Sequence, residues 1–164
     1  MNKERYIRLM DWGKSSQRKT WWIHFINQFT TDFISIVYPI LLMVLVLQGD
    51  ERLIRAVFVP AISFVLVSIF RHSYDEKRPY IVYEYEPVIR KDKVGKSMPS
   101  RHVFSAFIVA MTFLYIQPFL SIPVFLCAVA MCFGRVISGV HYTKDVIVGT
   151  ILGIGLGIIG FYLI

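Results

Sequence analysis

Long stretches of this 164-residue sequence contain no charged residue. Lys, Arg, Asp and Glu are absent from residues 33–47, 56–70, 103–116 and 146–164. Soluble domains carry about 25% charged residues along their whole length, whereas this chain has 18% charged and 55% apolar residues. The missing charge excludes an ordinary soluble domain and predicts an integral membrane protein.

Acidic residues are also scarce, at 11 against 18 Lys and Arg, which gives a formal net charge of +7. A surplus of this kind is typical of proteins that bind nucleic acid or an anionic membrane surface. Because the basic residues stand beside the apolar stretches, we expect the membrane as partner and no nucleic acid. Cys127 and Cys132 are the only cysteines and share one apolar stretch, so no disulfide or zinc pattern is present.

The apolar stretches predict an all-α fold, a polytopic membrane bundle of about five transmembrane helices in a single domain, residues 1–164. We expect the crossings at about 22–48 or 30–48, 53–70, 99–116, 122–136 and 143–164. Residues 1–20 are polar, so we expect an interfacial N-terminal segment with a short helix and no cleaved leader. Trp21 and Trp22 are typical of a membrane boundary. Pro118 and Pro123 are predicted to mark the turn between the third and fourth crossings.

Residues 71–101 form the longest polar segment and are rich in Tyr, Lys and Arg. The segment is too polar to cross the bilayer and too long for a simple turn. Because long loops are usually functional, we predict an active-site loop here.

Three glycines of the last crossing, Gly149, Gly153 and Gly157, recur every four residues. Such a stripe of small residues lets another helix approach closely. We expect it to serve packing within one bundle rather than homodimerisation, and the oligomeric state stays open.

The segment GRVISGVHYTKD, residues 134–145, carries the first candidate site residues: Arg135, His141 and Asp145. A histidine and an aspartate at i and i+4 share a helix face, so the carboxylate can hold one ring nitrogen and leave the other free. His141 is therefore a candidate nucleophile or base. Arg135 is a fixed cation suited to a phosphate.

Two further clusters lie at matching helix ends, and five crossings place all three clusters on one membrane face. The first contains Arg71 and Arg78, the latter followed by a proline, and the second is the run Pro-Ser-Arg-His that ends at His102. Arginines can neutralise the oxygens of a phosphate ester. Ser100 and the backbone N–H groups of the following helix add donors where the helix dipole favours an anion.

Together the three clusters resemble the signature of the type 2 phosphatidic acid phosphatase family, which includes undecaprenyl diphosphatases and, more distantly, vanadium haloperoxidases. The resemblance implies hydrolysis of a lipid phosphate or diphosphate through a phosphohistidine, without a metal or other cofactor. It implies that His141 attacks phosphorus, that Asp145 orients it, and that His102 protonates the leaving oxygen and then activates water. The phosphate-binding residues are then Arg71, Arg78, Ser100, Arg101 and Arg135.

The sequence departs from the family pattern at three positions. Arg71 replaces the usual lysine, Arg101 replaces the usual glycine, and Gly134 replaces the usual serine. These changes leave both histidines and the carboxylate in place, so they affect the expected substrate more than the expected activity. An additional cation at Arg101 has two interpretations, contact with a second phosphate or exposure to water.

For the substrate we favour undecaprenyl diphosphate, with phosphatidate or phosphatidylglycerophosphate as alternatives. Sixteen of the 18 Lys and Arg fall on the face with the three clusters and the N-terminus, and only Arg52 and Arg55 on the other. The positive-inside rule then predicts a cytoplasmic active site. Analogy with the family's undecaprenyl diphosphatases favours the extracytoplasmic face.

A lone histidine is usually a polar surface residue, and we expect this of His24 and His72. The lysines of the loop are expected to contact solvent or headgroups: Lys77, Lys91, Lys93 and Lys96. The spacing of histidines and carboxylates does not complete a zinc site. The rival functions are a non-catalytic lipid-binding or transport protein, a vanadate-dependent oxidase and a phosphatase of soluble sugar phosphates.

Overall fold

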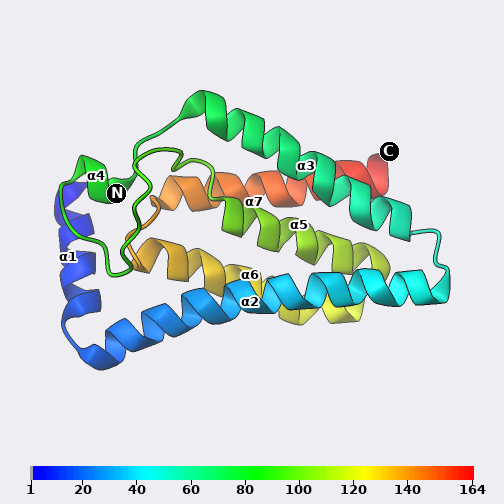
Figure 1. The fold of residues 1–164 in the computed structure, drawn as a ribbon, viewed down its shortest axis with the longest axis horizontal. Helices are drawn as coiled ribbons and strands as arrows, with labels where there is room; N and C mark the ends of the chain where they lie inside the picture. The colour runs from blue at the N-terminus through cyan, green and yellow to red at the C-terminus, as the bar shows by residue number, and fades with distance from the viewer. Residues whose placement is uncertain (1) are drawn as a thin grey trace.

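The computed structural model describes residues 2–164, and over these residues it contains helices and no strands (Figure 1). The helices are α1 (Lys3–Lys14), α2 (Gln17–Gln48), α3 (Leu53–Tyr74), α4 (Pro79–Val82), α5 (Arg101–Ile116), α6 (Pro118–Ile137) and α7 (Thr143–Ile158), which continues as the π-helix η1 (Ile159–Leu163). The prediction of an all-α bundle is confirmed.

Four helical segments are long and apolar enough to cross a membrane: α2, α3 together with α4, α6, and α7 together with η1. They run side by side, and their outward faces carry exposed large hydrophobic residues that water would disfavour (Figure 1). The prediction of a multi-pass membrane protein is confirmed. α5 has 16 residues and spans only about 24 Å, less than the roughly 30 Å of hydrocarbon.

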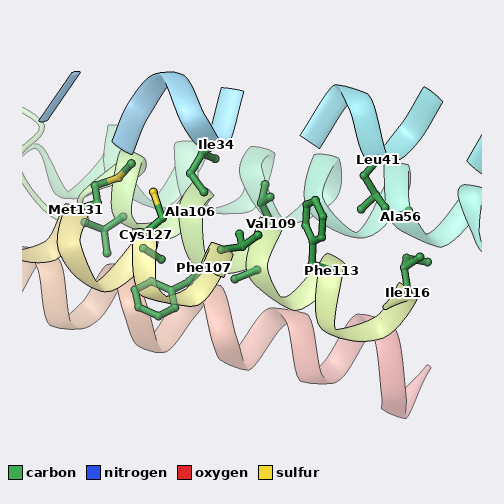
Figure 2. Close-up of a cluster of buried hydrophobic side chains, with 14 of the residues drawn as sticks. Ile34, Leu41, Ala56, Ala106, Phe107, Val109, Phe113, Ile116, Cys127 and Met131 are labelled. Atoms are coloured by element: carbon green, nitrogen blue, oxygen red, sulfur yellow. The ribbon is translucent and has the colours of Figure 1, made fainter. Parts of the chain in front are cut away.

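α5 is the central helix of the bundle, because α6, α7, α3 and α2 all pack against it. Its side chains form the largest share of the main hydrophobic cluster, which Figure 2 shows around Phe107, Val109 and Phe113. The glycine stripe of α7 faces this helix: a Cβ at Gly153 would lie 2.7 Å from the Cβ of Phe107, and one at Gly157 equally close to Met111. The stripe therefore packs within one bundle, as predicted.

Several helix boundaries differ from those predicted. α2 begins at Gln17 rather than at 22 or 30: Thr20 Oγ1 donates to the carbonyl of Gly13 of α1 at 3.1 Å, and Ile23 and Asn27 are buried. α5 begins at Arg101, two residues after Pro99. α6 begins at Pro118 and includes Pro123, so the connection to α5 is Gln117 alone. Proline at the first helical position loses no hydrogen bond, which explains this start.

α1 lies across the end of the bundle, roughly perpendicular to the long helices, which fits the predicted interfacial segment (Figure 1). Its fully buried Tyr6 donates a hydrogen bond of 3.1 Å to the carbonyl of Gly139. Burial raises the pKa of Tyr6, so this hydroxyl stays protonated. Gly139 has φ of +79°, and a Cβ there would clash with Met10 Sδ. α1 thus holds the turn that leads directly into His141.

Candidate active site

Six of the eight predicted site residues line one small cavity at the α1 end of the bundle. They are Arg71, Arg78, Arg101, His102, Arg135 and His141. Lys91 and Lys93, which we expected in solvent or at headgroups, line the same cavity although both are exposed. Its volume is about 90 Å³, roughly three times the liquid volume of one water. This basic cavity therefore has the size and charge to take one small anion.

His141 is held by a buried carboxylate, as predicted, but not on a shared helix face: His141 lies in the turn before α7, and Asp145 lies in the first turn of that helix. His141 Nδ1 lies 3.3 Å from Asp145 Oδ2, and the two side chains are 3% and 0% exposed. With a proton on Nδ1 donated to the carboxylate, Nε2 keeps its lone pair. That arrangement suits an imidazole nucleophile.

Asp145 lies behind His141, outside the cavity lining, and is itself fixed by two further donors. Its Oδ2 accepts from the backbone N–H of Tyr142 at 3.0 Å, which caps the start of α7, and from the hydroxyl of Ser97. Ser97 is fully buried and comes from the loop, 48 residues away in sequence. The carboxylate therefore has one orientation, set by both the helix start and the loop.

Arg71 in α3 and Arg78 in the loop position backbone as well as charge. Arg71 donates to the carbonyl of Pro99 at 2.6 Å, which ties the end of α3 to the start of α5. Arg78 donates to the carbonyl of Val140 at 3.3 Å, directly before His141. Burial lowers the pKa of Arg78. A buried guanidinium of this kind gains from an anion placed beside it.

Arg135 is oriented by α2, which the sequence did not predict. Its Nη2 donates to Thr31 Oγ1 at 2.8 Å. Next to it, α2 approaches position 134 closely: a Cβ on Gly134 would lie 3.2 Å from Asn27 Nδ2, so Asn27 would have to shift slightly. Asn27 also donates to the carbonyl of Gly134 at 2.9 Å. The glycine is therefore used for close packing of α2 on α6.

Ser100 is placed differently from the other predicted phosphate ligands. It is fully buried, it does not line the basic cavity, and its hydroxyl has no hydrogen-bond partner among residues 2–164. Its backbone N–H donates to the carbonyl of Asp145 at 3.0 Å, which joins α5 to α7. Its role as a phosphate donor stays a prediction.

Two larger spaces adjoin the basic cavity. The first, which we call the lateral groove, has a volume of about 300 Å³ and is lined by Thr31, Ile34, Ser35, Phe64, Arg101, His102, Ser105 and Met131. It lies where α2 and α3 diverge towards the site end of the bundle (Figure 1). The second, which we call the outer pocket, has a volume of about 610 Å³ and is lined by Ser68, Arg71, His72, Asp75, Lys77, Lys93, Val94, Gly95, Lys96 and Arg101. Arg101 lines all three spaces, and its guanidinium lies 5.7 Å from the ring centre of Phe64.

The sequence profile of the PAP2 superfamily matches residues 52–164, which is more than half of the chain. The chain belongs to the PAP2 superfamily. The match contains all eight predicted site residues, whereas α1 and α2 precede it. Tyr6, Asn27 and Thr31 thus support the PAP2 site from outside the matched region.

Solved structures share the fold of this PAP2 protein. LpxE of Aquifex aeolicus is 22% identical, with a TM-score of 0.75 over 97% of this chain and 93% of that chain. The first transmembrane PAP2 type phosphatidylglycerolphosphate phosphatase from Bacillus subtilis is 19% identical, with a TM-score of 0.74 over 96% and 81%. A search of curated proteins by sequence found no match.

The part of the chain that the structure describes holds no group of three or more His, Cys, Asp and Glu arranged to bind a metal ion. Metal independence of the reaction stays a prediction.

Burial lowers the pKa of His141 to about 4, although the hydrogen bond to Asp145 raises it. Free histidine titrates near pH 6.5. The side chain of His141 should therefore stay neutral and nucleophilic from pH 6.5 down to about pH 4. As pH falls through about 4, protonation removes the lone pair. We expect kcat/KM, corrected for the substrate phosphate's own titration near pH 6, to persist down to about pH 5. An acid limb centred near 6.5 in the corrected profile would contradict this.

Ser97 is the clearest site residue that the sequence did not reveal, since nothing in its spacing links it to position 145. We expect Ser97→Ala to lower kcat about tenfold, because one donor to a buried carboxylate is lost. KM should change little, since Ser97 does not line the basic cavity. Ser121→Ala, which removes a buried serine near the other end of α6, is the matched control. Equal kcat values for the two variants would show that Ser97 does not position the carboxylate.

Proposed function

We propose that this PAP2 protein is a metal-independent membrane phosphatase that hydrolyses a lipid phosphate or diphosphate through a phosphohistidine on His141. The observation that carries the proposal is the basic cavity, where six Lys and Arg side chains and two histidines surround space for one small anion. One of those histidines, His141, is backed by a buried carboxylate. This combination supplies both charge neutralisation and a nucleophile.

The reaction proceeds in two displacements. In the first, Nε2 of His141 attacks phosphorus in line, the bond to the lipid oxygen breaks, and His102 gives that oxygen a proton. In the second, His102 takes a proton from water, the water oxygen attacks phosphorus, and the P–N bond electrons return to Nε2. The arginines bind the equatorial oxygens throughout, and general acid–base help of this kind is worth about 10²–10⁴-fold.

The lateral groove supports a lipid rather than a sugar phosphate as substrate. His102 and Arg101 line both this groove and the basic cavity. The proposed general acid therefore lies where the cavity opens between α2 and α3, towards the exposed apolar faces of those helices. A leaving oxygen attached to a lipid tail can reach His102 while the tail stays in the bilayer.

Among lipids we favour undecaprenyl diphosphate, on the basis of the surplus cations around the site. Phosphatidylglycerophosphate is the second candidate, because the neighbour from Bacillus subtilis is named as its phosphatase. Phosphate release from undecaprenyl and farnesyl diphosphates, phosphatidate, phosphatidylglycerophosphate and a sugar phosphate, in detergent with EDTA, tests the proposal. His141→Ala protein, prepared in parallel, controls for contaminating phosphatases. We expect release by the wild type alone; no release from any lipid would favour a non-catalytic lipid-binding protein.

The site and the N-terminus lie on the same membrane face, and we propose that this face is cytoplasmic. The support is the distribution of Lys and Arg, of which all but Arg52 and Arg55 lie at that end. Single cysteines introduced at the exposed Arg8 and Glu51 can be labelled in intact cells with an impermeant thiol reagent. Label at position 51 alone is expected. Label at position 8 alone would place the active site on the extracytoplasmic face. Protein that carries only the native Cys127 and Cys132 gives the background labelling.

A further inference from the structure

We propose that a groove on the outward face of α2 binds a membrane phospholipid whose headgroup carries a primary ammonium. This groove, which we call the aromatic groove, has a volume of about 330 Å³ and is lined by Phe25, Gln28, Phe29, Asp32, Phe33, Ile36 and Val37. It shares no lining residue with the basic cavity, the lateral groove or the outer pocket. The lipid is therefore a ligand separate from the substrate, and the inference stands apart from the proposed function.

The aromatic groove contains an isolated carboxylate. Asp32 is the only Lys, Arg, Asp or Glu between Lys19 and Asp50, and its side chain is exposed. Among residues 2–164 its only hydrogen-bond partner is Gln28, whose Nε2 lies 3.0 and 2.9 Å from the two carboxylate oxygens. An amide donor leaves the negative charge uncompensated, and a carboxylate can accept further hydrogen bonds.

Asp32 lies inside the apolar band of the bundle, near its edge. It follows Trp22, a residue typical of the membrane boundary, by ten residues, or about 15 Å of helix. It precedes Gln48 by 16 residues, or about 24 Å, which is less than the roughly 30 Å of hydrocarbon. Helical side chains lean towards the N-terminus, so this carboxylate reaches back towards the headgroups. A charge at this depth is costly unless a partner neutralises it, and the neutralising cation must come from outside the described chain.

Aromatic rings flank the carboxylate along the same face of α2. Ring centroids of Trp21 and Phe25 lie 5.2 Å apart, and those of Phe25 and Phe29 lie 5.6 Å apart. Phe33 continues the series, with its centroid 6.0 Å from that of Phe29. The faces of aromatic rings attract cations. The rings and the carboxylate therefore favour the same kind of ligand, an ammonium group.

The bulk of this face favours a lipid over a second copy of the chain. α2 runs along one edge of the bundle (Figure 1), and every residue that lines the aromatic groove belongs to it. Transmembrane helices usually pack together through small residues, as Gly153 of α7 does against α5. The groove instead presents the exposed side chains of Phe25, Phe29 and Ile36. Flexible acyl chains can fill the spaces between such side chains, and their headgroups lie at the level that Asp32 reaches.

A primary ammonium suits this groove better than the quaternary ammonium of a choline headgroup. It has three N–H donors for charge-assisted hydrogen bonds to the carboxylate. A quaternary ammonium has none, so only its attraction to the rings and to the negative charge remains. The chemistry of the groove thus points to a zwitterionic phospholipid of the ethanolamine type.

The test is equilibrium binding of dioleoyl phosphatidylethanolamine and dioleoyl phosphatidylcholine to the detergent-solubilised full chain, followed by native mass spectrometry. The two lipids have the same tails and the same zero net charge, so the basic cavity should not separate them. We expect the ethanolamine lipid to bind about tenfold more tightly, the effect of one charge-assisted hydrogen bond. Equal affinities would overturn the inference.

Asp32→Asn should abolish the preference, because it keeps the size of the side chain and removes its charge. Glu51→Gln is the matched control and should keep the preference, since it removes an exposed carboxylate between α2 and α3, at the opposite end of the bundle. Thermal unfolding checks that both variants fold. A preference that Asp32→Asn retains would contradict the assignment. So would a wild-type dimer that Asp32→Asn converts to a monomer without any lipid preference, because the carboxylate would then face a second copy of the chain.

Discussion

Replacement of His141 by alanine is expected to reduce phosphate release by at least about 10⁴-fold, because the covalent route loses its nucleophile. The residue is 3% exposed and its Nδ1 faces Asp145, so the substitution removes Nε2 without disturbing the arginines on the opposite walls. Lipid binding should survive, since those cations remain. The measurement is single-turnover phosphate release at saturating lipid, with affinity measured separately.

A covalent intermediate gives the sharper form of this experiment. Wild-type protein quenched during turnover of ³²P-labelled lipid should carry label that is stable in alkali and released in acid, as expected of a phosphoramidate. His141→Ala should carry none, and the exposed histidine variant His24→Ala should label like the wild type. Residual turnover above about 1% of wild type in His141→Ala would mean that water attacks phosphorus directly. The histidine would then be a base.

Replacement of His102 by glutamine is expected to lower kcat for lipid substrates about 10²–10⁴-fold, the usual contribution of general acid–base catalysis. The expected loss depends on the leaving group. An activated aryl phosphate departs without protonation, so its first step should be nearly unchanged in the variant. The second step still needs a base for water, so phosphohistidine should accumulate and aryl alcohol should appear as a burst.

The burst distinguishes acid–base catalysis from simple phosphate binding by His102. If the side chain only bound phosphate, both substrates would lose rate equally and no burst would appear. His24→Gln serves as the control, since His24 is exposed on α2 and lines none of the three spaces. The His102→Gln variant retains the lateral groove, so lipid entry should not limit its rate.

The broad class of this protein follows from its sequence for simple physical reasons. Charge-free stretches of membrane-spanning length have few other stable environments, which is why the all-α membrane bundle was predicted and found. The order of the three clusters along the chain, with helices alternating in direction, placed them at one end of the bundle. The structure brings Arg71, His102 and His141 to one cavity there.

Local boundaries were less predictable because tertiary packing overrides hydropathy. The polar start of α2 was expected outside the helix, yet it is helical from Gln17 because Ile23 and Asn27 pack inward. Pro123 was expected in a turn, yet it lies inside α6. The importance of α5 was also hidden: a 16-residue apolar segment suggests a short crossing, and only the packed structure shows it as the centre of the bundle.

The supporting residues of the site were invisible in sequence because they are contacts between distant positions. Tyr6 reaches Gly139 across 133 residues, Asn27 reaches Gly134 across 107, and Ser97 reaches Asp145 across 48. No periodicity or spacing rule connects such pairs. The lysines of the loop were likewise predicted as solvated, since a loop's path over the site has no sequence signature.

The sequence by itself determined the membrane class, the family and the residue types of the site, because hydrophobic length and motif spacing are local properties. Only the tertiary structure decided which side chains orient Asp145, which residues hold the turn before His141, and that a second basic pocket adjoins the first. Those features arise where α1, α2 and the loop close over the end of the bundle. That closure depends on packing between segments that are far apart in the chain.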